Sequence, residues 1–138
     1  MSSIARFGIS LDKGLLGKFD KLIESKSYTN RSEAFRDLIR QELVKKEWQD
    51  ANEVIGAITL IYDHHKRELV NKLLDTQHEF GSCIISSQHI HIDHNNCLEI
   101  LAVKGSPEKI QRLSDNLKSV KGVKHLTLSM STTGKDMT

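Results

Sequence analysis

Residues 78–99 read HEFGSCIISSQHIHIDHNNCLE, and this stretch decides how the second half of the chain folds. Apolar and polar side chains alternate up to position 93, which is the pattern of a half-buried β-strand. The turn-forming residues Asp-His-Asn-Asn follow at 93–96, and an apolar run from Cys97 to Val103 then returns as a second strand. The stretch therefore predicts a β-hairpin formed by residues 82–94 and 97–104.

The same hairpin carries side chains that bind metals. His89 and His91 share one face of the first strand, with Cα atoms about 6.5–7 Å apart. Directly opposed residues of an antiparallel pair share a face, so a loop with an odd number of residues, most simply three, brings Cys97 to the two histidines. An even loop turns Cys97 away. We predict the odd loop, and with it a metal site of two imidazoles and a thiolate.

Two histidines and one thiolate leave a four-coordinate site one ligand short. His78, at the end of the preceding helix, is the candidate for the fourth position. The spacing leaves open whether His78 reaches its own hairpin or that of another subunit. A lone histidine is more often a solvated or structural imidazole, but three ligands on one hairpin favour a metal. The opposite side of the hairpin is expected to be its core, made of Ile90, Ile92, Leu98 and Ile100.

The flanking patterns complete a domain at residues 51–138. A strand is expected at 54–62 and a helix at 66–79 before the hairpin. Ser106 and Pro107 begin a second helix that Gly122 ends, and a last strand follows. The order strand-helix-strand-strand-helix-strand is the ferredoxin-like arrangement, of the sort seen in ACT-type regulatory domains, and it leaves one sheet face free for assembly.

Residues 1–50 have a different pattern. A short strand is expected at 4–11, a helix from about Asp12, and a second helix after Asn30, which continues toward the polar segment 46–53. One strand and two helices of this length cannot bury a core alone, so dimerisation is implied. The chain is therefore expected to be α+β, with two modules.

Bulk properties narrow the class of protein. The 138 residues have the composition of a globular protein, and no apolar run approaches the roughly 18 residues of a membrane span. We therefore expect a cytoplasmic protein without a membrane partner. Two cysteines suggest no disulfide framework, so Cys83 is interpreted as a small core residue. The net charge of +2 hints only weakly at an anionic partner.

The first module resembles the ribbon-helix-helix DNA-binding module. The resemblance implies that two such strands pair antiparallel and enter the major groove of double-stranded operator DNA. It also implies that the start of the second helix contacts phosphate, where backbone N–H groups and the helix dipole favour an anion. The residues assigned to DNA are Arg6, Gly8, Ser10, Asn30, Arg31 and Ser32. Gly8 stands where related sequences often carry a hydroxyl, so base reading depends on Arg6 and Ser10.

The whole chain, from Arg6 to about Ser131, resembles the nickel-responsive transcriptional regulators of the NikR family. The metal motif that carries the resemblance is Thr76, Gln77 and His78, then His89, His91, Asn95, Cys97, Leu98 and Glu99. The resemblance implies a square-planar site for one Ni²⁺ per subunit, made by His89, His91 and Cys97 of one subunit and His78 of a neighbour. It implies a homotetramer, a dimer of dimers, which represses nickel-uptake genes when nickel is bound and is not an enzyme. Tyr62 and Glu99 are assigned to positions that support the ligands.

Further matches are less specific. Glu33 and Asp37, one helical turn apart, correspond to carboxylates that hold K⁺ or a similar cation between the domains of the family, although a solvated helix face explains them equally. Lys66 and Arg67 match a loop that touches DNA non-specifically. Adjacent histidines at 64–65 are candidates for a second, weaker metal, but such pairs more often bind nothing, and His94 and His125 are not expected to be high-affinity ligands.

The ligand types do not select the metal, because a Cys-His₃ set suits zinc and copper binds nitrogen and sulfur sites more tightly than nickel. Nickel therefore rests on the resemblance. A DNA-binding regulator that responds to another transition metal, or to a small metabolite through its ACT-like domain, remains the alternative. A metalloenzyme or metal carrier is disfavoured, since four protein ligands leave no open coordination position and no base is evident.

Overall fold

The computed structural model describes residues 3–135 and 137. The chain falls into two compact units that divide between Leu43 and Val44, inside the helix α2 (Arg31–Asp50). The module boundary predicted at residues 50 and 51 coincides with the end of this helix. The compact units therefore divide earlier along the helix than the sequence modules do.

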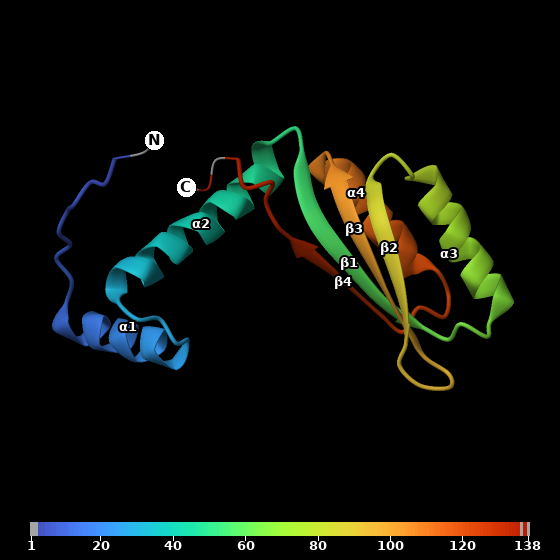
Figure 1. The fold of residues 1–138 in the computed structure, drawn as a ribbon, viewed down its shortest axis with the longest axis horizontal. Helices are drawn as coiled ribbons and strands as arrows, with labels where there is room; N and C mark the ends of the chain where they lie inside the picture. Colours follow the sequence, from blue (N-terminus) through green and yellow to red (C-terminus); the bar gives the residue numbers. More distant parts are fainter. Residues whose placement is uncertain (1–2, 136, 138) are drawn as a thin grey trace. The chain divides into compact units, whose positions relative to one another are not determined.

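The first unit contains α1 (Lys13–Ser25) and the N-terminal part of α2. Asp12 caps α1, and Asn30 caps α2 by accepting a hydrogen bond at 2.9 Å from the backbone N–H three residues later. The strand expected at 4–11 is not formed, and residues 3–12 run as an irregular segment before α1 (Figure 1). A strand requires a neighbouring strand to exchange hydrogen bonds with, and the described residues of this unit supply none.

The second unit is a four-stranded antiparallel sheet in the order β2-β3-β1-β4, with two helices (Figure 1). Its elements are β1 (Val54–Tyr62), α3 (Arg67–Glu79), β2 (Ile84–His91), β3 (Cys97–Gly105), α4 (Pro107–Ser119) and β4 (His125–Met130). This is the predicted ferredoxin-like arrangement, and the α+β fold class is confirmed.

The core of the second unit lies between the sheet and its two helices. Residues of β1 and β3 alternate between buried and half-buried, as side chains on opposite faces do. Both helices bury apolar side chains against the sheet. No helix in the described part of the chain is both long and apolar enough to cross a membrane. The buried set includes Val54, Ile58, Leu60, Leu69, Leu73, Leu101, Val103, Ile110, Leu113 and Leu117.

The hairpin loop has an odd number of residues, as predicted, but the buried face of the hairpin is the one opposite to that predicted. His91 pairs with Cys97, so the loop holds residues 92–96, an odd number, and Cys97 shares the face of both histidines. Cys97 is 1% exposed, whereas Ile90 and Ile92 are 38% and 52% exposed. The prediction that the isoleucine side is the core is therefore wrong. The helices cover the ligand side, and no described residue covers the other.

A register irregularity between Ile84 and Ser86 explains a second difference. Strict alternation along β2 would put Ile84 on the same face as Ile90, but Ile84 pairs with Val103 of the buried face and packs against the core. A β-bulge places an extra residue in one strand and so exchanges the two faces.

The C-terminal part of α2 belongs to the second unit through Trp48. The indole Nε1 donates a hydrogen bond to the Ser131 carbonyl at 2.9 Å, and the ring lies against Gly56. A Cβ at Gly56 would lie 2.8 Å from the Ser129 carbonyl oxygen. The polar segment 46–53 is thus helical to Asp50 and packed on the sheet.

Candidate metal centre

The register of the hairpin gathers the candidate ligands at one end of the sheet. Cys97 lies opposite His91 on β2 and opposite Tyr62 on β1. The Cys97 Sγ atom is 4.0 Å from Nδ1 of His89. Cys97 is buried, whereas the His89 side chain is 50% exposed. The position between them is therefore closed by β3 and accessible from the edge strand β2.

The Sγ–Nδ1 separation fits a shared metal ion. A metal–sulfur bond of about 2.3 Å and a metal–nitrogen bond of about 2.0 Å place the two donor atoms at most about 4.3 Å apart. At 4.0 Å, one ion can contact both atoms without movement of the backbone. A thiolate paired with imidazole is a donor set for nickel, copper or zinc rather than for calcium or magnesium.

Glu99 organises the side chains behind this pair. It is 1% exposed and lies opposite His89 in the ladder. Its carboxylate accepts hydrogen bonds from the Tyr62 hydroxyl at 2.8 Å and from Nε2 of Gln77 at 2.5 Å, and Nε2 of His89 lies 3.1 Å away. Donors on three sides compensate the cost of burying this charge.

The contact with Glu99 also determines which nitrogen of His89 faces the cysteine. A carboxylate only accepts hydrogen bonds, so Nε2 carries the proton in this contact and Nδ1 keeps its lone pair. A carboxylate behind a ligating imidazole is a common way to fix its tautomer and orientation. His89 therefore presents Nδ1 to the position beside Cys97.

Tyr62 closes the site from β1. Its hydroxyl donates to Glu99 and lies 3.4 Å from Nδ1 of His89. Burial, together with the hydrogen bond to Glu99, raises the pKa of Tyr62 well above its ordinary value. The phenol is therefore neutral at physiological pH and acts as a donor that holds Glu99 in place.

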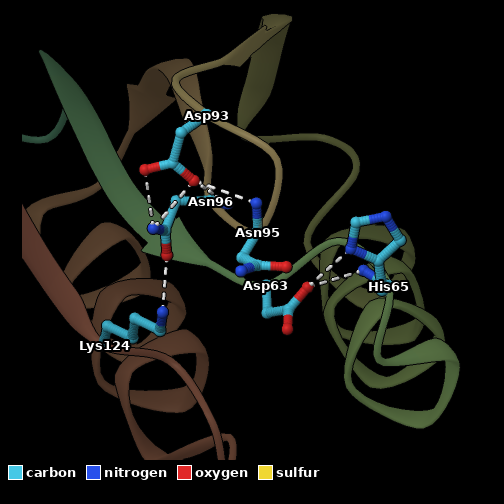
Figure 2. A network of polar contacts seen from close by, with 6 residues as sticks. All are labelled: Asp63, His65, Asp93, Asn95, Asn96 and Lys124. Carbon is cyan, nitrogen blue, oxygen red and sulfur yellow. Dashed lines mark hydrogen bonds and ion pairs between the residues drawn. The ribbon is translucent and has the colours of Figure 1, made fainter.

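The turn between the candidate ligands is held by Asp93 (Figure 2). Asp93 accepts hydrogen bonds from the backbone N–H groups of Asn95 and Asn96 at 2.9 Å, and the Asn96 side chain accepts one from Lys124 at 2.5 Å. The hydrogen bonds from Asn96 and Asn95 lower the pKa of Asp93. The turn is thus pinned to the segment that precedes β4.

His91 and His78 are not beside the His89–Cys97 pair. The His91 ring is stacked on that of His64, with ring centroids 4.5 Å apart and planes 9° apart. His78 is exposed in the last turn of α3, and within residues 3–135 no side-chain contact joins it to its own hairpin. Its neighbour Gln77 does bind Glu99. Sequence reasoning assigned no contact to Gln77, because its partner is 22 residues away.

The residues assigned to DNA lie on the surface. The exposed set is Arg6, Gly8, Ser10, Asn30, Arg31, Ser32, Lys66 and Arg67. Two have contacts within their own unit, since Asn30 is the α2 cap and Arg31 binds both carboxylate oxygens of Asp20 at 2.9 and 2.8 Å. Each partner of this ion pair favours the charged form of the other, which lowers the pKa of Asp20.

Glu33 and Asp37 have separate partners. Glu33 accepts a hydrogen bond from Thr29 at 2.8 Å, and Asp37 accepts one from the Tyr28 hydroxyl. The contact with Asp37 raises the pKa of Tyr28. A shallow pocket is lined by Tyr28, Glu33, Arg36, Asp37 and Arg40. The cation site assigned to these carboxylates stays a prediction.

Two family models match the chain. Residues 55–131 match the "NikR C terminal nickel binding domain", and residues 5–46 match the "Ribbon-helix-helix protein, copG family". Together they cover both sequence modules.

Similar proteins span almost the whole chain. A protein of Syntrophus aciditrophicus named "Putative nickel-responsive regulator" is 62% identical over 135 residues, covering 98% of each chain. A protein of Chlorobium phaeobacteroides with the same name is 59% identical over 131 residues, covering 95% of this chain and 98% of its own. Among solved structures, an uncharacterized protein of Thermotoga maritima has a TM-score of 0.52 at 16% identity, covering 56% of this chain and 96% of that chain, and it is similar in fold.

Proposed function

We propose that this chain, which belongs to the family of nickel-responsive transcriptional regulators, is a repressor of nickel-uptake genes that binds operator DNA when Ni²⁺ is bound. One Ni²⁺ per subunit is held by His89, His91 and Cys97, with His78 of a neighbouring subunit as the fourth ligand. Operator DNA lies in the cytoplasm, which is where the protein acts.

The observation that carries the proposal is the Sγ–Nδ1 pair of Cys97 and His89, held from behind by Glu99. His91 occupies the same face at the end of β2 and joins the ion by rotating its exposed ring away from His64. The exposed His78 of one chain supplies no ligand to its own hairpin, which is consistent with a ligand directed to another subunit. The metal is thereby a link between subunits.

Two uncovered apolar surfaces support a tetramer. The sheet face opposite the helices carries Ile90 and the half-buried Leu98 and Ile100, which a second sheet would bury. The segment 3–12 exposes 86% of Ile4 and 78% of Phe7, which pairing with the same segment of another chain would cover. We infer a dimer in which the segments 3–12 of two chains pair as a two-stranded β-ribbon. Two such dimers then form the tetramer by packing their sheets against each other.

DNA recognition follows from the paired ribbon. Arg6 is the charged side chain on the strand face that also carries Gly8 and Ser10, and a guanidinium suits guanine in the major groove. Lys66 and Arg67 add contacts to phosphate. Glu33 and Asp37 hold K⁺ or a similar cation once a second element brings further oxygen ligands to them.

The test is operator binding with and without Ni²⁺, measured for the natural chain, Cys97→Ser and the matched control Cys83→Ser. Cys83 is buried and carries the other free thiol. Nickel should tighten operator binding and produce a sulfur-to-nickel charge-transfer band, and Cys97→Ser alone should lose both effects. Nickel-independent operator binding by the natural chain, or an unchanged band in Cys97→Ser, would contradict the proposal.

A further inference from the structure

The turn formed by residues 92–96 directly joins two of the proposed nickel ligands. His91 is the last residue of β2, and Cys97 is the first residue of β3. Most of the turn is exposed, so packing does not hold its residues, and fixing each of them costs conformational entropy. The contacts that keep the turn in one conformation therefore help to determine how well the two ligands are placed before a metal binds.

Asp93 closes the turn on itself. Its carboxylate accepts hydrogen bonds from the side-chain amide of Asn96 at 3.1 and 3.0 Å, in addition to those from two backbone N–H groups of the turn. The Asn96 carbonyl also accepts a hydrogen bond from the Ile92 N–H at 2.9 Å. These contacts shape the turn, but all of them lie within it. They do not position the turn relative to the rest of the sheet.

Lys124 connects the turn to the sheet, although it lies 28 residues along the chain from Asn96 (Figure 2). Its Nζ atom donates a hydrogen bond to the Asn96 Oδ1 atom at 2.5 Å. The Lys124 backbone N–H donates to the Ile61 carbonyl at 2.8 Å, so its main chain is fixed to β1. The next residue of β1, Tyr62, lies opposite Cys97. Lys124 therefore ties the turn to the end of the sheet where the thiol lies.

We propose that Lys124 and Asn96 are positioning residues for the nickel site, which hold the turn in the conformation that places His91 and Cys97 for the metal. The inference rests on the proposed function, because it takes these two side chains as ligands. Lys124 acts through Asn96 and supplies no ligand, because an ammonium group has no acceptor lone pair. A metal binds only the fraction of the protein whose ligands are in place, so opening of the turn lowers the apparent affinity in proportion.

The experiment measures nickel affinity, by competition against a chelator, in full-length Lys124→Met, which keeps most of the side-chain stem and removes the donor. The affinity should fall by roughly 3–10-fold, because the loss of one hydrogen bond shifts the equilibrium between closed and open turn by about that factor. Lys124→Arg retains a donor and should restore most of the affinity. The matched control is Lys109→Met, which removes a hydrogen bond of 2.7 Å to Ser82, before the opposite end of β2, and should leave the affinity unchanged.

Further readouts separate positioning from a general effect on stability. The sulfur-to-nickel charge-transfer band of nickel-saturated Lys124→Met should match that of the natural chain, because the ligands are the same. In the metal-free protein, the amide hydrogens of Asn95 and Asn96 should exchange faster in Lys124→Met, whereas the free energy of unfolding should change little. Adding Lys124→Met to Asn96→Ala should cause no further loss of affinity, since both changes break the same connection.

Natural nickel affinity in Lys124→Met, or an equal loss in Lys109→Met, would overturn this inference and leave the proposed function standing. A further loss in the double variant would also overturn it, because Lys124 would then act by another route. If the natural chain bound nickel without a charge-transfer band, the proposed ligand set would be wrong, and the proposed function and this inference would fail together.

Discussion

Replacing Glu99 by glutamine tests whether the buried carboxylate prepares His89 for the metal. Glutamine has the same shape, and its single acceptor oxygen can still serve Tyr62 and His89 if Gln77 turns its own amide oxygen toward the new amide group. Hydrogen bonds to a charged group contribute about 1.5–3 kcal/mol and neutral ones about 0.5–1.5 kcal/mol. Each of the three contacts of Glu99 should therefore weaken by about 1 kcal/mol.

The two readouts of Glu99→Gln should separate. The lost contact energy is offset in part because an uncharged group at a position only 1% exposed is cheaper to bury, so the free energy of unfolding should change little. Nickel affinity should fall by roughly 10–100-fold, since an amide oxygen accepts the hydrogen bond from His89 more weakly than a carboxylate and raises the basicity of the ligating nitrogen less. Competition against a chelator measures the affinity, and denaturant unfolding of the metal-free protein measures the stability. A folded variant with the natural nickel affinity would refute the role of Glu99.

Four further predictions follow from other parts of the chain. Arg6→Ala should weaken specific operator binding by about 1–3 kcal/mol and leave nickel affinity unchanged. If the variant and the natural protein bound the operator equally well, the segment 3–12 would be excluded as the element that recognises the bases. Gly56→Ala should destabilise the sheet by about 1–3 kcal/mol, because its Cβ would meet the Ser129 carbonyl oxygen. Gly17→Ala in α1 is the control, because its Cβ meets nothing within 4 Å, and it should not destabilise the protein. Unfolding curves of both variants measure the difference. The folded-state pKa of Asp93 lies below the ordinary value of 3.8, so its contribution to stability is present above that value and is lost as the pH falls through the folded pKa. In Asp93→Asn, the free energy of unfolding should therefore fall less as the pH is lowered into the acid range, as unfolding measured at a series of pH values would show. Finally, nickel should tighten binding to an operator with two half-sites by a factor near the upper end of the range of about 5- to 150-fold, and it should barely change binding to a single half-site. An equal effect on both, measured at the same salt concentration, would mean that nickel acts locally on each pair of segments 3–12.

Much of the fold was predictable because its signals are local. The apolar runs at 54–62 and 97–103, the Ser106-Pro107 helix start and the Asn30 cap all report on neighbouring residues, and the structure places these elements within a few residues of their expected bounds. The shared strand face of Cys97 and the two histidines also followed from strand parity, which is a property of the hairpin alone.

The sequence by itself determined the order of the elements, the hairpin and the residue types gathered on it. Only the tertiary structure decided which side of the hairpin is covered, that Ile84 changes face at a bulge, and that Gln77, Tyr62 and Glu99 meet behind His89. It also decided that the His91 ring rests on His64 and that residues 3–12 have no strand to pair with. Periodicity specifies which residues share a face, but the face that becomes buried depends on where distant helices pack, and a strand becomes ordered only when another strand accepts its hydrogen bonds.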